Sequence, residues 1–200
     1  MFDNQFRVIK EKIFVMLAQT GLGGVSPLWL SLIGLLFGAA TAVVLVYRLY
    51  SIAFVLWFFN RVFDGLDGTV ARMSATQSDL GGYVDILVDF VVYALIPIGL
   101  VWGRPSAPGF NALIFLLATY YVNAASWMYL SAILEKRRLS QAEKLTTVNM
   151  PPGLIGGAAT IFFYSLFIVL PQFSVQLFTL MGILVLVTIL QRLWWAKGNL

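Results

Sequence analysis

Long apolar runs alternate with short polar stretches along almost the whole chain. A helix needs about 20 apolar residues to span the hydrocarbon core of a bilayer. Six runs approach or reach that length, at residues 27–47, 52–71, 82–102, 110–134, 153–170 and 175–195. The pattern predicts an all-α integral membrane protein with six transmembrane helices. Residues 1–200 would form a single membrane domain, with the six-helix bundle at 27–195.

The first 20 residues have a different pattern. Five apolar residues recur at helical spacing there, namely Phe2, Phe6, Ile9, Ile13 and Met16. Basic and acidic residues lie between them, which a cleaved signal peptide would not tolerate. We therefore predict an N-terminal amphipathic helix at 1–20 that lies in the membrane interface, with a frayed tail as the alternative.

Composition agrees with the membrane assignment and limits the chemistry. Hydrophobic residues make up 60% of the chain and charged residues 11%, with a mean hydropathy of +0.88, which a soluble domain does not show. The chain has no histidine and no cysteine. This excludes a His- or Cys-ligated zinc site, a histidine base, a cysteine nucleophile and any disulfide.

Basic residues predict the orientation, because loops rich in Lys and Arg face the cytoplasm. An inside N-terminus would place ten basic residues on the cytoplasmic side, namely Arg7, Lys10, Lys12, Arg72, Lys136, Arg137, Arg138, Lys144, Arg192 and Lys197. Only Arg48 and Arg104 would lie opposite, with Arg61 inside a span. Both termini and the loops at 72–80 and 135–152 should thus be cytoplasmic. The net charge of +4 then reflects topology and anionic lipid rather than a nucleic-acid partner.

Four aspartates lie within two of the predicted spans, where ionisable residues are costly and mark function. Asp64 and Asp67 share one face of the second span, and Asp85 and Asp89 share one face of the third. The polar segment 74–80 would connect the two spans as antiparallel neighbours, with Ser78 or Asp79 as the helix cap. A rise of about 1.5 Å per residue puts the four carboxylates at two levels, a deep pair and a shallow pair.

The deep pair, Asp64 and Asp89, would lie roughly 12 Å from the cytoplasmic end, and the shallow pair, Asp67 and Asp85, roughly 6 to 7.5 Å. Two carboxylates about 6 Å apart repel by roughly 3 kcal/mol at an effective dielectric constant near 20. Hard divalent cations such as Mg²⁺ or Mn²⁺ relieve this repulsion and also bind phosphate. The pattern predicts a metal site, and any general base must be a carboxylate.

Small residues and one cation accompany the aspartates. Gly68 and Gly81 would let a ligand approach the helices closely, Ala71 is nearly as small, and Arg72 is placed to bind a phosphate. Taken singly, the glycines could equally be helix-packing residues and Arg72 a membrane anchor. The combination favours a phosphate-bearing ligand.

These positions resemble a family signature. The string Asp64-x2-Asp67-Gly68-x2-Ala71-Arg72-x8-Gly81-x3-Asp85-x3-Asp89 is similar at every fixed position to that of the CDP-alcohol phosphotransferases. The resemblance implies six transmembrane helices, an interfacial N-terminal helix and a homodimer. With the orientation predicted from the basic residues, the active site would face the cytoplasm of a prokaryotic-type inner or cell membrane. It also implies transfer of a phosphatidyl-type group from a CDP-lipid such as CDP-diacylglycerol to an alcohol, with release of CMP.

The resemblance also implies roles for individual residues. All four aspartates, Asp64, Asp67, Asp85 and Asp89, would surround one or two Mg²⁺ or Mn²⁺ ions. The CDP moiety would be held by Gly68, Ala71, Arg72 and Gly81. Catalysis would depend on Asp89 as the general base, with Asp85 beside it.

The acceptor alcohol is less constrained. Members of the family that use glycerol 3-phosphate or inositol phosphate often have Pro after the third aspartate, or Lys or Arg after the fourth, whereas this chain has Ile86 and Phe90. A phosphorylated acceptor needs nearby cations, so the sequence favours an unphosphorylated head group, with the phosphorylated acceptors as the alternative.

The sequence gives weaker evidence for functional roles of other polar and aromatic residues. Arg61 would pair with Asp64, snorkel, or contact an acceptor phosphate. Aromatic residues that would line an acceptor site by cation–π contact are Tyr120, Tyr121, Trp127 and Tyr129. Packing is the commoner role of such residues, and Asn123 and Ser126 are expected to form interhelical hydrogen bonds.

Two other classes of function remain. A divalent-cation transporter would also place acids on adjacent helices, but it has no need of a glycine-lined cleft with Arg72 at its mouth, and the spans show no inverted repeat. A non-catalytic scaffold would have no reason to keep four buried carboxylates.

Overall fold

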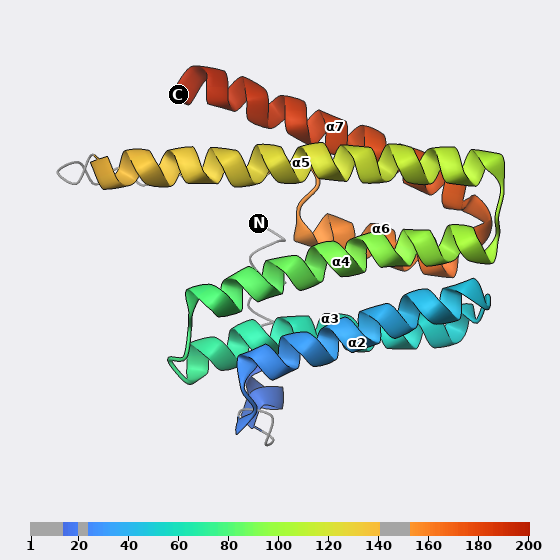
Figure 1. Cartoon of the computed structure of the whole chain (residues 1–200), viewed down its shortest axis with the longest axis horizontal. Coiled ribbons are helices and arrows are strands. Elements are labelled where there is room, and N and C mark those ends of the chain that lie inside the picture. The colour runs from blue at the N-terminus through green and yellow to red at the C-terminus, as the bar shows by residue number, and fades with distance from the viewer. Residues whose placement is uncertain (1–13, 20–23, 141–152) are drawn as a thin grey trace. The chain divides into compact units, whose positions relative to one another are not determined.

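A computed structural model of the chain describes residues 14–19, 24–140 and 153–200, and all regular secondary structure in these residues is helical (Figure 1). The helices are α2 (Pro27–Val46), α3 (Tyr50–Met73), α4 (Asp79–Gly103), α5 (Ala107–Ser140), α6 (Gly157–Val169), the 3₁₀ turn η2 (Pro171–Phe173) and α7 (Ser174–Asn199). They form two compact units, at residues 1–104 and 105–200.

Each of the six predicted spans corresponds to a helix, which confirms the all-α membrane fold. Four helical segments are long and apolar enough to cross a bilayer, at Pro27–Val46, Asp79–Gly103, Ala107–Arg137 and Pro171–Asn199. α3 has 24 residues but carries four charged side chains, and α6 has only 13 residues. The number of spans therefore stays a prediction.

One predicted segment is described only in part, and another differs from the prediction. Residues 14–19 are helical, and the rest of the amphipathic helix predicted at 1–20 lies outside the described residues. The predicted loop at 135–152 is wrong at its start, because α5 continues to Ser140. Its last residues are good helix formers with charged side chains, so the helix outlasts its apolar stretch.

In the first unit, α2 is the helix against which the other two pack. α2 lies along both α3 and α4, whereas α3 and α4 make little direct backbone contact. Glycines permit the close approach: a Cβ atom on Gly38 would lie 2.4 Å from Val92, and one on Gly99 would lie 2.4 Å from the Ala42 carbonyl oxygen. The prediction that these two spans are neighbours is borne out by their side chains, since Arg61 on α3 contacts Asp89 and Tyr93 on α4, while α2 packs against both backbones.

Caps and a small core fix the ends of this unit. Ser78 is the N-cap of α4, and its hydroxyl accepts a hydrogen bond from the Gly81 amide at 3.1 Å, as predicted. At the opposite end, Arg48 donates from Nε to the Gly103 carbonyl at 2.6 Å, which satisfies a terminal carbonyl of α4. Near the start of α2, Ala18 is buried with Leu30.

The second unit is held together by α5 and α7, which lie along each other. Arg192 on α7 donates from Nη1 to the Asn123 side chain at 3.0 Å and to the Ser126 hydroxyl at 3.3 Å. The interhelical hydrogen bonds expected of these two α5 residues are confirmed. Arg192 is itself buried, so its role includes packing as well as the predicted contribution to topology.

Candidate active site

A cavity of about 520 Å³ opens in the first unit where α3 ends and where α2 and α4 begin. α2 contributes Ser26, Pro27, Leu28 and Ser31 to its wall. Six residues singled out from the sequence also line it, namely Asp67, Gly68, Ala71, Arg72, Gly81 and Asp85. Residues from three helices thus form one concave site that includes all four predicted nucleotide-binding positions.

The glycines of the cavity are not packing residues. A Cβ atom on Gly68 would meet only the Arg72 guanidinium, at 3.4 Å, and one on Gly81 would meet only the Ser78 hydroxyl, at 3.2 Å. Both neighbours belong to the same helix or its cap, in contrast to Gly38, which lies against another helix. Within the described part of the chain, no other helix lies within 4 Å of a Cβ atom at either position, which favours ligand approach over helix packing.

The cavity wall is positively polarised at several points. α2 begins at Pro27 and α4 at Asp79, so both helices direct their N-terminal ends, which carry partial positive charge, toward this region. Arg72 also lines the cavity and donates to the Thr69 hydroxyl at 3.3 Å. Helix N-termini together with a guanidinium are suited to a phosphate or pyrophosphate group.

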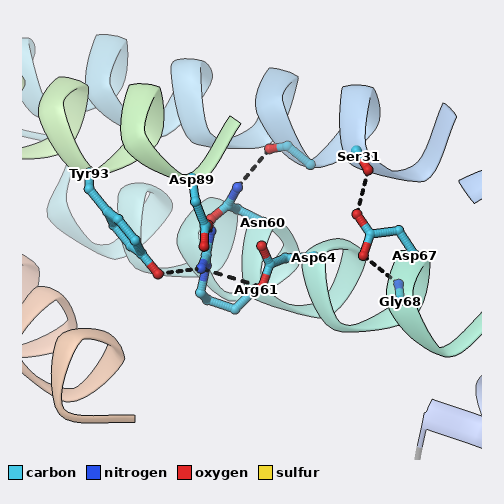
Figure 2. A network of polar contacts seen from close by, with 9 residues as sticks. Ser31, Asn60, Arg61, Asp64, Asp67, Gly68, Asp89 and Tyr93 are labelled. Atoms are coloured by element: carbon cyan, nitrogen blue, oxygen red, sulfur yellow. Dashed lines mark hydrogen bonds and ion pairs between the residues drawn. The ribbon is translucent and has the colours of Figure 1, made fainter. Parts of the chain in front are cut away.

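Asp67 is held in a fixed orientation at the cavity wall (Figure 2). Asp67 is buried, with only 5% of the residue exposed to solvent. The Ser31 hydroxyl donates to one carboxylate oxygen, and the backbone amide of Gly68 donates to the other. Ser31 is not evident as a site residue from the sequence, since a single hydroxyl in an apolar helix gives no sign of which neighbour it faces.

Arg61 connects the deep carboxylate pair (Figure 2). Its guanidinium lies 3.0 Å from Asp89 and 3.4 Å from Asp64. It also donates to the Tyr93 hydroxyl at 2.9 Å and to the Asn60 side-chain oxygen at 2.8 Å. The predicted pairing of Arg61 with Asp64 is confirmed, and the link to Asp89 on α4 is an addition from the structure.

The four carboxylates occupy the two levels that the helical rise predicts. Asp67 and Asp85 line the cavity, whereas Asp64 and Asp89 contact Arg61. Asp85 and Asp89 are near enough for their charges to act on both Asp64 and Asp67. Among the described residues, no three acidic side chains converge closely enough to form a ready metal-ligand group. The cluster is therefore assembled as two pairs rather than as one tight cage.

The aromatic residues proposed for the acceptor belong to the second unit. Tyr120 directs its hydroxyl to the Met181 sulfur at 3.7 Å, and Tyr121 is exposed. Their assignment to the acceptor stays a prediction. Arg61 already donates to three side chains, so an acceptor phosphate would have to compete with these contacts.

Residues 24–194 match the family model described as CDP-alcohol phosphatidyltransferase. A curated relative, the inner membrane protein YnjF of Escherichia coli, is 31% identical over 176 residues, which cover 86% of this chain and 82% of that protein. The bifunctional IPC transferase and DIPP synthase of Archaeoglobus fulgidus is 35% identical over 94 residues, or 45% of this chain and 19% of that protein.

Two solved structures have the same fold at low sequence identity. Both are of the phosphatidylinositol phosphate synthase PgsA1 of Mycobacterium tuberculosis, and each is 16% identical to this chain. The structure with CDP-DAG bound has a TM-score of 0.64 and covers 92% of each chain. The structure with manganese and citrate has a TM-score of 0.62 and covers 92% of this chain and 87% of that one.

Proposed function

The chain belongs to the CDP-alcohol phosphatidyltransferase family, and on this premise we propose that it moves the phosphatidyl group of CDP-diacylglycerol to an alcohol and releases CMP. The chain is an integral membrane enzyme that transfers a group from a CDP-lipid to an alcohol. One observation carries the finer proposal. Six of the eight signature positions line a single cavity, and no other described helix lies within 4 Å of a Cβ atom at either of its signature glycines.

The donor nucleotide would bind in this cavity. Gly68 and Gly81 leave room for the CDP moiety beside the helix backbones, with Ala71 on the same wall. Arg72 and the N-terminal ends of α2 and α4 supply positive charge for the pyrophosphate. The diacylglycerol tails would stay in the bilayer, which suits a cavity at the end of apolar helices.

The carboxylates fit a hard divalent cation, Mg²⁺ or Mn²⁺. Asp67 and Asp85 line the cavity, and Asp64 and Asp89 lie at the next level, where they contact Arg61. Such ions prefer carboxylate oxygens and share them with substrate phosphates. When bound, the metal neutralises charge that develops on the leaving CMP. The manganese in the PgsA1 structure supports this assignment.

Asp89 is proposed as the general base, with Asp85 beside it. The acceptor hydroxyl loses its proton to the Asp89 carboxylate as its oxygen forms a bond to the β-phosphorus, the one that carries the diacylglycerol. The bond between that phosphorus and the bridging pyrophosphate oxygen breaks, and the electron pair leaves with CMP. Arg61 holds one oxygen of Asp89 at 3.0 Å, which fixes the orientation of the carboxylate.

The acceptor is proposed to be an unphosphorylated head-group alcohol. Ile86 and Phe90 follow the third and fourth aspartates, so neither of these positions provides a cation for an acceptor phosphate. Glycerol 3-phosphate and inositol phosphate are the alternatives. Tyr120 and Tyr121 remain candidates for acceptor contact.

The proposal includes a membrane arrangement. The four long apolar segments would each cross the bilayer, and α3 and α6 would add the fifth and sixth crossings. The N-terminal helix would lie in the membrane interface. The distribution of Lys and Arg supports a cytoplasmic location for both termini and the cavity, at an inner or cell membrane. Two copies of the chain would form a homodimer.

Replacing Ser31 with alanine tests the support of the metal ligand. Without the hydroxyl, Asp67 loses one of its two donors, and Mn²⁺ affinity measured by calorimetry is expected to fall by roughly 10-fold or more. The control is Ser165→Ala, since that hydroxyl donates within its own helix, to the Ile161 carbonyl at 2.8 Å. Equal Mn²⁺ affinities in the two variants would mean that Ser31 does not support the ligand.

Gly68→Leu tests the nucleotide cavity. The added side chain meets no other described helix within 4 Å of its Cβ atom and replaces a helical glycine, so thermal stability should be kept or slightly raised. CDP-diacylglycerol affinity is expected to fall by at least about 10-fold, equivalent to roughly 1.4 kcal/mol. Gly157→Leu is the control, because it makes the same change in a different helix, where nothing lies within 4 Å of a Cβ atom. Unchanged affinity in Gly68→Leu would remove Gly68 from the binding site.

A screen of acceptors tests the whole proposal. Purified protein is incubated with labelled CDP-diacylglycerol, Mg²⁺ or Mn²⁺, and one alcohol at a time, and the lipid product is identified by its mass. The panel contains serine, choline, ethanolamine, inositol, glycerol 3-phosphate, inositol phosphate and phosphatidylglycerol. We expect a product with an unphosphorylated alcohol. A product only with a phosphorylated acceptor would overturn the acceptor class, and no product with any of them would count against the reaction.

A further inference from the structure

Arg72 has a defined conformation at the wall of the cavity. It lies in the last turn of α3 and lines the cavity, and its side chain runs back along the helix, since Nη1 would lie 3.4 Å from a Cβ atom on Gly68. Nη2 donates a hydrogen bond to the Thr69 hydroxyl at 3.3 Å. Within the described residues, no carboxylate lies at ion-pair distance from Arg72. Its charge is therefore available to an anion, while Thr69 holds the guanidinium in place.

The Thr69 hydroxyl is fixed by contacts of its own. Thr69 is 4% exposed, and its Oγ1 donates to the Gly65 carbonyl at 2.9 Å. A hydroxyl has one proton and two lone pairs, so after this donation it is left to accept from Arg72. A Cβ atom on Gly65 would lie 2.5 Å from the Phe14 ring, so this turn of α3 is packed against residues 14–19. The acceptor for Arg72 thus belongs to a packed part of the helix, although Arg72 is exposed.

Thr41 shows the same local bond without an arginine. It is also buried, and its hydroxyl donates to the Phe37 carbonyl at 2.8 Å, four residues back in α2. The Thr41 hydroxyl has no second hydrogen-bond partner in the described part of the chain. Bonding to the carbonyl four residues back is a common use of a hydroxyl inside a helix. The feature that distinguishes Thr69 is that it also accepts a hydrogen bond from a cation of the cavity.

Holding Arg72 in advance favours the binding of an anion. A free arginine side chain loses rotamer freedom when it binds a ligand, and a side chain that is already held loses less. The guanidinium has five N–H donors, and the bond to Thr69 uses a donor on Nη2, so the others remain for phosphate oxygens. A phosphate that approaches the helix at Gly68 would therefore meet a guanidinium that is already oriented.

We propose that Thr69 is a positioning residue for the donor: its hydroxyl holds the Arg72 guanidinium beside Gly68, where the guanidinium binds the pyrophosphate of the CDP-lipid. Thr69 is not among the residues that line the cavity, so it acts through Arg72 and not by contact with the substrate. The inference rests on the proposed function, because that function supplies the pyrophosphate. It assigns a role to a position that lies between the fixed residues of the signature.

The test is the affinity of the full chain for CDP-diacylglycerol in the presence of Mn²⁺, measured by calorimetry. Thr69→Val keeps the shape and removes the hydroxyl, and the affinity is expected to fall by roughly 3- to 10-fold, the range for freeing one flexible side chain. Thr69→Ser keeps the hydroxyl and should bind the donor to within about 2-fold of the unaltered chain. CMP release at saturating donor should change little in Thr69→Val, because the lost interaction serves binding.

Thr41→Val is the matched control. It removes a hydroxyl that makes the same bond to the carbonyl four residues back, at a position that is also buried. Because Thr41 holds no cavity residue, the affinity for CDP-diacylglycerol should stay that of the unaltered chain.

A double-mutant cycle separates positioning of Arg72 from support of the fold. In an Arg72→Met background, Thr69→Val should cause no further loss of affinity, because its effect passes through Arg72. An equal loss in that background, or an unchanged affinity in Thr69→Val alone, would overturn the inference. If Thr69→Val does not fold, Thr69→Ala replaces it in both backgrounds.

Failure of the inference is distinguishable from failure of the proposed function. If Thr69→Val binds CDP-diacylglycerol as tightly as the unaltered chain does, the inference fails while the proposed function stands. If the unaltered chain binds no CDP-diacylglycerol, the proposed function itself fails, and the inference fails with it.

Discussion

Asp89→Asn is expected to lower turnover by about 10²- to 10⁴-fold, which is the usual contribution of a positioned general base. The amide has nearly the shape of the carboxylate but cannot accept the proton of the acceptor hydroxyl. CDP-diacylglycerol should still bind to within a few-fold, because the cavity is lined by Asp67 and Asp85 rather than by Asp89. The measurement is CMP release under saturating donor, together with donor affinity.

The matched control for this variant lies on the same helix. Asp79 is exposed in the first turn of α4, and it does not line the cavity, so Asp79→Asn makes the same chemical change away from the reacting groups. It should leave turnover within a few-fold of the unaltered chain. Near-normal turnover in Asp89→Asn would remove Asp89 from the role of base.

Asp67→Ala is expected to abolish the dependence of donor binding on metal. Asp67 is the buried carboxylate at the cavity, and Ser31 and the Gly68 amide orient both of its oxygens. Loss of the side chains that merely support metal ligands costs 10- to 100-fold in affinity, so loss of the ligand itself should cost about 100-fold or more. Calorimetric titration of CDP-diacylglycerol with and without Mn²⁺ measures the effect.

The Asp67→Ala variant also leaves the Ser31 hydroxyl and the Gly68 amide without their partner, which destabilises the fold. Asp67→Asn is therefore measured beside it, because the amide oxygen keeps an acceptor for Ser31 while the negative charge is lost. Both variants should lose the metal-dependent part of the donor affinity. If either retains it in full, Asp67 is not a metal ligand.

The arrangement of the acids was largely predictable from the sequence. The helical rise separates Asp64 and Asp89 from Asp67 and Asp85, and the structure has the deep pair at Arg61 and the shallow pair at the cavity. This part succeeded because residues three and four apart on a helix share a face whatever the tertiary packing. The Ser78 cap was predictable for the same reason, since it is local.

Contacts between helices were less predictable. The sequence indicates that Arg61 can reach Asp64, but its bond to Asp89 depends on how α3 and α4 are held by α2. Ser31 gave no signal because its partner lies 36 positions away. Gly38 and Gly99 mark where α2 approaches its neighbours, yet one sequence does not distinguish such packing glycines from Gly68 and Gly81. That no other described helix lies against the latter pair is a property of the structure alone.

The count of six membrane crossings stays a prediction for a physical reason. α3 is long enough but carries the charges of the site, so the residues that perform the chemistry also weaken the signal for a span. α6 is apolar but 13 residues long, which is short of the roughly 20 needed to cross the hydrocarbon core.

The most direct measurement uses purified protein in liposomes that contain CDP-diacylglycerol, with CMP release and divalent-metal flux followed in the same sample. Our account predicts CMP in equal amount to new lipid product, only when both an alcohol and Mg²⁺ or Mn²⁺ are present, and no metal flux above that of empty liposomes. Metal flux without CMP release would contradict the account and would assign the aspartates to cation transport.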